Sequence, residues 1–144
     1  MPEVINMNNT NNRILIVDDE LYVTKICTLA LEHYGYKVDA SNDPKEALSK
    51  YKPRSYDLVI LDIKMPEMNG FELFQEIKKK DNNAKICFLT ASELYYKEFR
   101  EKEFRSLDRN LFIRKPVAIK ELVAQVNKMI NKDTHLEIIS LSHR

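Results

Sequence analysis

The sequence predicts one α/β domain built on a five-stranded parallel sheet, because three observations agree. Strand-like segments alternate with segments of helical periodicity over residues 13–131. Three of the strand-like segments contain unbroken apolar runs (ILIV, LVIL and ICFL), which are typical of strands covered by helices on both faces. A length of 144 residues, with 44% hydrophobic and 31% charged residues, suits a single soluble globular domain.

The elements follow in strict alternation along the chain. The predicted strands are 13–17, 36–40, 57–61, 85–89 and 111–114. The predicted helices are 20–34, a helix that starts at Asp43-Pro44, 70–80, 92–105 and 117–131. Gly35 supplies a stop for the first helix. Strand–helix units in this order form right-handed crossovers.

The second strand is more polar than its neighbours, which places it at an edge of the sheet. This favours the flavodoxin-like doubly wound fold with strand order 2-1-3-4-5, flanked by five helices. The Asn-rich residues 1–12 are expected to form a flexible arm. Residues 13–131 are the domain, and 132–144 are expected to be a loosely held C-terminal tail.

Composition excludes several classes of protein. A net charge of +1 gives no reason to expect a nucleic-acid partner, and the apolar runs are too short to cross a membrane. No secretory signal opens the chain. Cys27 and Cys87 lie in apolar patterns, as reduced core thiols of a cytoplasmic protein do. Only two glycines are present, which rules out a P-loop or dinucleotide turn and disfavours a flavin site.

Polar residues follow the ends of four predicted strands. They are Asp18-Asp19-Glu20, Asp62, Thr90 and Lys115-Pro116. The carboxyl ends of parallel strands meet at one edge of the sheet, where such folds bind their ligands. Clustered carboxylates without nearby His or Cys imply a hard cation, and an open cleft favours Mg²⁺, with Mn²⁺ as a substitute. A hard cation, a carboxylate, a lysine and a hydroxyl together suit phosphoryl transfer.

These residues lie in blocks that resemble the receiver domain of two-component response regulators. The blocks are ILIVDDE (14–20), LVILDIKMPEMNGFEL (58–73), FLTAS (88–92) and IRKP (113–116). The resemblance implies that Asp62 is the phosphoacceptor. It also implies that Asp19, Asp62 and the backbone carbonyl of Lys64 bind Mg²⁺, with Asp18 acting through water.

The resemblance assigns further roles around the phosphoryl group. Thr90 and Lys115 would bind its oxygens, and the Lys115–Pro116 peptide would be cis. Lys64 and Ser92 would line the path of the attacking water and so tune dephosphorylation, although a solvated lysine is an equal alternative for Lys64. Phe112 is either the aromatic that swings inward when Thr90 moves or a static core residue.

The implied partners are proteins. The donor would be a sensor histidine kinase or a phosphotransfer protein, and phosphorylation would switch a face formed by the fourth helix, fifth strand and fifth helix toward an unknown target. We expect a monomer before phosphorylation. The chain ends thirteen residues after the last predicted helix without a DNA-binding pattern, which favours a stand-alone chemotaxis-receiver-like protein over part of a longer regulator.

Two departures and two alternatives qualify this interpretation. Residues 104–108 replace the small residues usual in the family, and the aromatics of the fourth helix form either a partner-binding face or a core stripe.

A constitutive interaction module with the same fold is one alternative function. An Mg²⁺-dependent phosphohydrolase with an Asp nucleophile is another, disfavoured because Lys64 stands where such enzymes place a second Asp.

Overall fold

The computed structural model describes residues 11–91, 112–116 and 118–143, with 132–143 described as backbone. It contains one parallel sheet. Its strands are β1 (Arg13–Val17), β2 (Lys37–Ser41), β3 (Leu58–Asp62), β4 (Ile86–Thr90) and β5 (Phe112–Arg114). They lie in the order β2-β1-β3-β4-β5, and every neighbouring pair is parallel. The predicted fold class and strand order are confirmed.

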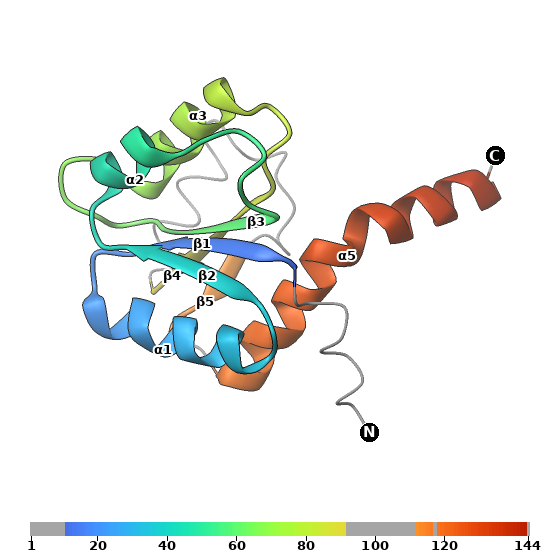
Figure 1. The fold of residues 1–144 in the computed structure, drawn as a ribbon, viewed down its shortest axis with the longest axis horizontal. Helices are drawn as coiled ribbons and strands as arrows, with labels where there is room; N and C mark the ends of the chain where they lie inside the picture. The colour runs from blue at the N-terminus through green and yellow to red at the C-terminus, as the bar shows by residue number, and fades with distance from the viewer. Residues whose placement is uncertain (1–10, 92–111, 117, 144) are drawn as a thin grey trace.

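Helices cover both faces of this sheet (Figure 1). They are α1 (Leu21–His33), α2 (Pro44–Lys50), α3 (Gly70–Lys80) and α5 (Ile119–His143). Figure 1 shows α2 and α3 over one face and α1 and α5 over the other. Four of the five predicted helices are thus observed, and the one predicted over 92–105 lies outside the described residues.

The two-sided cover explains the unbroken apolar runs of the central strands. Alternate residues of β1, β3 and β4, such as Leu15 and Phe88, pack in a core cluster with α2 and α3. The residues between them, such as Ile16 and Cys87, pack in a second cluster with α1 and α5. Cys27 and Cys87 are free, buried thiols in this second cluster, which confirms their core placement.

The helix starts follow from local capping. The Asp43 side chain accepts hydrogen bonds from the backbone N–H groups of Lys45 (3.0 Å) and Glu46 (3.4 Å), as its predicted position requires. Asn69 and Glu72 form a capping box at the start of α3. Gly35 adopts a φ of 96° after α1, a conformation that favours glycine.

The C-terminal residues differ from the expectation. The helix predicted over 117–131 begins at Ile119 and continues past its predicted end to His143. Figure 1 shows this half of α5 projecting away from the sheet and its helices. Because residues 132–143 include no glycine or proline, nothing in the sequence ends the helix at 131.

Three strands end one residue later than predicted. Asp62 is the last residue of β3 and pairs with Leu89, and Thr90 is the last residue of β4 and pairs with Arg114. The two polar residues are therefore held by the sheet itself. None of the helices in the described ranges combines the length and apolar character needed to cross a bilayer.

Candidate functional site

The acidic residues meet at the carboxyl end of the sheet. Asp18 and Asp19 directly follow β1, and Asp62 ends the neighbouring strand β3. One carboxylate oxygen from each of the three lies within 4.8 Å of the others. Asp18 and Asp62 are buried, whereas Asp19 is exposed. The three acids that follow neighbouring strands therefore lie together, as the strand order predicts.

Lys115 reaches this cluster from the end of β5. Its backbone N–H donates to the carbonyl of Thr90 (2.8 Å), which fixes the residue beside β4. Its Nζ atom lies 2.9 Å from Asp18 Oδ2 and 3.3 Å from Asp62 Oδ1. The Lys115–Pro116 peptide is cis, as the sequence comparison with receivers implied.

Glu20 also forms an ion pair with this lysine. Its Oε1 atom accepts a hydrogen bond of 2.8 Å from Lys115 Nζ. The lysine therefore contacts three carboxylates, which come from Asp18, Glu20 and Asp62. The sequence analysis placed Glu20 among the strand-end residues but assigned it no role in the site.

Burial and crowding shift the acids of the cluster. Burial raises the pKa of Asp62 to about 7, and the charge of Asp18 adds to the rise while Lys115 opposes it. Burial also raises the pKa of Asp18, against the hydrogen bonds from the Glu20 N–H and Lys115. Burial alone lowers the pKa of Lys115, but its bonds to Glu20 and Asp18 outweigh burial, and the pKa is raised. The single ammonium of Lys115 therefore does not neutralise all the negative charge of the acidic cluster.

A second loop supports the acidic one. Asn42, directly after β2, donates through Nδ2 to the backbone carbonyl of Asp18 (2.8 Å) and to Thr24 Oγ1 (3.0 Å). The Asp18 N–H donates to the carbonyl of Ser41 (3.1 Å). Asn42 was missed by the sequence reasoning, although a polar residue at the same end of the edge strand was the available signal.

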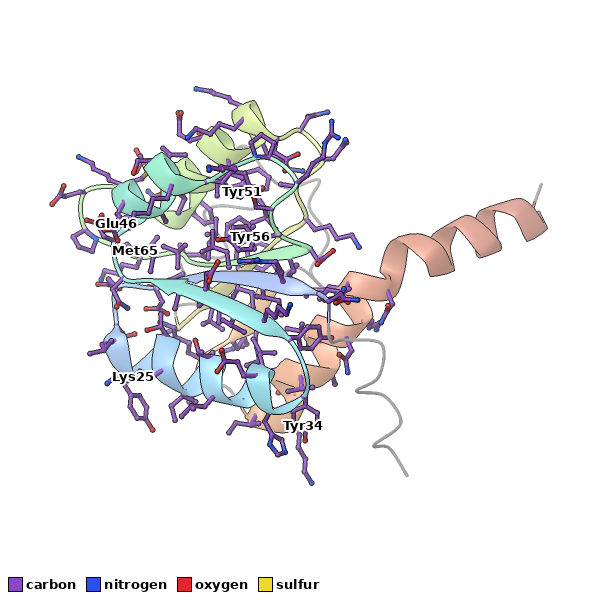
Figure 2. All side chains as sticks on the ribbon, in the orientation of Figure 1. Lys25, Tyr34, Glu46, Tyr51, Tyr56 and Met65 are labelled. Carbon is purple, nitrogen blue, oxygen red and sulfur yellow. The ribbon has the colours of Figure 1, made fainter. Side chains whose placement is uncertain are left out.

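A cleft of about 580 Å³ opens beside the acids. Its lining residues are Asp19, Glu20, Asp62, Lys64, Met65, Pro66, Thr90, Ala91 and Lys115. Figure 2 shows Met65 at the same end of the molecule as Lys25, near the start of α1, and far from Tyr34 at the other end of that helix. Of the predicted site residues, Lys64 and Thr90 line this cleft together with Asp62. Ser92 lies outside the described residues.

Phe112 belongs to the core and is not a lining residue of the cleft. It is 9% exposed, and its ring stacks on that of Phe88 with centroids 5.2 Å apart. The structure therefore holds Phe112 in the inward position, which a static core residue keeps throughout and which the switch role assigns to the phosphorylated domain.

The donor set of the cleft fits a hard divalent cation. All candidate ligands from the three aspartates are carboxylate oxygens, which Mg²⁺ prefers. The buried Asp18 Oδ2 contacts Lys115 Nζ at 2.9 Å and has no further hydrogen-bond donor among the described residues. A water molecule bound to such a cation would donate a hydrogen bond to Asp18 Oδ2, and the cation would reduce the repulsion among the three carboxylates.

The fold and the cleft define a doubly wound α/β protein with an acid–lysine site at the carboxyl ends of its strands. Residues 14–127 match the model of the response regulator receiver domain family. The chain belongs to this family, whose members act in two-component signalling.

Curated relatives of similar sequence are response regulators. The chain is 32% identical to ArlR of Staphylococcus epidermidis over 129 residues, which cover 90% of this chain and 57% of that protein. It is 33% identical to SaeR of Staphylococcus aureus over 119 residues, which cover 83% of this chain and 50% of that protein. The chain therefore spans about half the length of the curated relatives it matches.

Solved structures of receiver domains superpose well on the chain. The non-phosphorylated receiver domain of HemR from Leptospira biflexa is 32% identical with a TM-score of 0.71, covering 83% of this chain and 94% of that one. TrrA of Thermotoga maritima, solved in complex with Mg²⁺ and BeF, is 36% identical with a TM-score of 0.68, covering 82% and 98%.

Proposed function

We propose that the domain spanning 13–131 is a phosphorylatable switch and that Asp62 is its phosphoacceptor. The observation that carries the proposal is the placement of Asp62 within 3.3 Å of Lys115 Nζ at the floor of an acid-lined cleft. A carboxylate oxygen of Asp62 attacks the phosphorus of a phosphohistidine on a sensor kinase or phosphotransfer protein. The new P–O bond forms as the P–N bond breaks, and the leaving imidazole nitrogen takes up a proton.

The other cleft residues bind the charge that this step moves. Asp19, Asp62 and the backbone carbonyl of Lys64 would hold Mg²⁺, with Asp18 acting through water, and the ion when bound supplies positive charge to the phosphoryl oxygens. Lys115 pairs with one phosphoryl oxygen. The hydroxyl of Thr90, at the end of β4 in the same cleft, donates to another.

The donor protein must approach the mouth of this cleft, and exposed apolar side chains follow two of its lining residues in the sequence. Leu21 and Tyr22 directly follow Glu20 and are 55% and 75% exposed. Ile119, which follows the Lys115–Pro116 turn and begins α5, is 45% exposed. Exposed apolar side chains that follow cleft residues in the sequence suit contact with the protein that delivers the phosphoryl group.

Lys64 is proposed to tune the lifetime of the phosphoryl group, because it lies two residues after Asp62 and lines the cleft. Lys64→Ala is expected to change the dephosphorylation rate, measured by loss of the phosphorylated mass, and an unchanged rate would contradict this role. Ser92 is proposed to act at the same step.

The unphosphorylated domain is proposed to be a monomer, which light scattering tests.

The output is proposed to change at the face around β5 and α5, together with the predicted fourth helix, toward an unknown protein target. Phe112 stacks on Phe88 in the structure. The proposed switch role requires this stack to open in the unphosphorylated domain and to form on phosphorylation. A constitutive interaction module would not need Asp18, Asp19, Asp62, Thr90 and Lys115 to converge. Their convergence supports phosphorylation.

The test is incubation with Mg²⁺ and acetyl phosphate, followed by intact mass spectrometry. We expect a gain of one phosphoryl group that Asp62→Asn abolishes and Asp57→Asn retains. Asp57 is a matched control because its carboxylate lies at the opposite end of β3 and accepts from the Arg13 N–H (2.7 Å). No gain in mass would support the constitutive module, and repeated turnover of a phosphoester would support the phosphohydrolase.

A further inference from the structure

Lys115 is fully engaged before any phosphoryl group is present. An ammonium has three protons to donate. Three carboxylates lie within ion-pair distance of Nζ: Glu20 at 2.8 Å, Asp18 at 2.9 Å and Asp62 at 3.3 Å. A phosphoryl group on Asp62 takes over the contact of the Asp62 carboxylate, and its oxygen must then share the ammonium with Asp18 and Glu20.

The three carboxylates differ in how readily they can release the lysine. The Asp18 side chain is fully buried and is held by the Glu20 N–H (2.9 Å), so it cannot move away without losing that bond. Asp62 is 6% exposed and carries the phosphoryl group itself. The Glu20 side chain is 60% exposed, so its carboxylate can return to water at small cost.

We propose that Glu20 competes with the phosphoryl group for Lys115. Glu20 holds the ammonium in the unphosphorylated domain and releases it to the phosphoryl oxygen once Asp62 is modified. This inference rests on the proposed function of Asp62. Its consequence is that Glu20 lowers the affinity of the site for a phosphoryl group and shortens the lifetime of the modified state.

Glu20→Gln removes the competing charge while leaving the backbone in place. The Glu20 carbonyl still accepts from the N–H groups of Val23 (3.1 Å) and Thr24 (3.2 Å). Its side chain makes no capping hydrogen bond at the start of α1, so the helix loses no cap. The variant is therefore expected to fold, which circular dichroism verifies.

The measurement is calorimetric binding of beryllofluoride, a phosphoryl mimic, to the full chain saturated with Mg²⁺. Because an ion pair with one solvated partner is weak, Glu20→Gln is expected to tighten binding by about threefold. In a Lys115→Ala background the same change is expected to have no effect, since no ammonium remains to compete for. Glu67→Gln is the matched control, because Glu67 is an exposed acid (71%) paired with Lys45.

Two results would overturn the inference while the proposed function stands. One is an unchanged affinity in Glu20→Gln when the wild type still binds the mimic and gains a phosphoryl group. The other is a gain in affinity from Glu20→Gln that is equal with and without Lys115→Ala, or that Glu67→Gln reproduces. Either gain would reflect the loss of negative charge in general. If the wild type neither binds the mimic nor gains a phosphoryl group, the proposed function fails, and the inference fails with it.

Discussion

The backbone of Gly70 lies against the carbonyl of Asp62. A Cβ atom placed on Gly70 would lie 2.2 Å from the Asp62 carbonyl oxygen, and the Gly70 N–H donates to the carbonyl of Ile63 (2.8 Å). The start of α3 is thereby packed onto the end of β3 that carries the phosphoacceptor. Gly70→Ala must push these two backbones apart, because neither contact partner is a flexible side chain.

We predict that Gly70→Ala lowers the free energy of unfolding by about 2 kcal/mol, as overpacking does. It should also weaken Mg²⁺ binding, since Asp62 moves with its carbonyl. Gly35→Ala is the control: it strains a φ of 96° and destabilises the domain, but it lies at the other end of the sheet. Denaturant unfolding and Mg²⁺ titration check both effects, and equal Mg²⁺ affinities of the two variants would contradict the prediction.

Asn42 is predicted to act on the site through the backbone of Asp18, without contacting a carboxylate of the cluster. Its Nδ2 atom ties the Asp18 carbonyl to Thr24, so Asn42→Ala frees the loop that carries Asp18 and Asp19. Removing a residue that orients metal ligands costs about tenfold or more in metal affinity. Calorimetric Mg²⁺ titration measures this loss. Asn131→Ala, which removes only a bond to the Asn127 carbonyl on α5, is expected to bind Mg²⁺ like the wild type.

The sequence predicted the sheet well because burial leaves a clear pattern. Residues Ile14–Val17 are buried against helices on both faces, and only an unbroken apolar run satisfies both. The strand ends were less predictable. Asp62 and Thr90 look like loop residues by polarity, yet the parallel ladder continues through them. Polarity marks the edge of the core, whereas backbone pairing decides where a strand ends.

The site was predictable only where strand order decides proximity. Asp18, Asp62 and Lys115 converge because their strands end at one edge of the sheet. The bond between Glu20 and Lys115 joins residues 95 positions apart and depends on side-chain and loop conformation, which no periodicity encodes. The bond from Asn42 to Asp18 depends likewise on how two loops meet.

The raised pKa of Asp62 predicts how stability depends on pH without metal. In the native state this pKa is about 7 against an ordinary value of 3.8, so the folded protein keeps a proton that the unfolded chain has lost. This contribution to stability is complete below about pH 4 and is lost as pH rises through about 7. In chelator, the free energy of unfolding should therefore fall from pH 5 to pH 8.

Asp62→Asn removes this dependence. Because the variant carries no charge to desolvate beside Asp18, it should exceed the wild type by about 1 kcal/mol at pH 8, with a smaller difference at pH 5. Urea unfolding at the two pH values measures this, and parallel pH profiles for the two proteins would contradict it. Saturating Mg²⁺ should stabilise the wild type at pH 8 and have little effect on the variant.

The two thiols are predicted to be unreactive in the native domain. Burial raises the pKa of Cys27 to about 11, with the charge of Asp18 adding to the rise, and raises the pKa of Cys87 to about 12. At pH 8 almost no thiolate is present, and the thiolate is the reactive form. A disulfide-exchange reagent should therefore label neither cysteine within minutes and both at once in denaturant. Ser49→Cys, at an exposed position of α2, supplies the positive control. Rapid labelling of the wild type would mean that the core cluster shared by α1, β4 and α5 opens far more often than its packing implies.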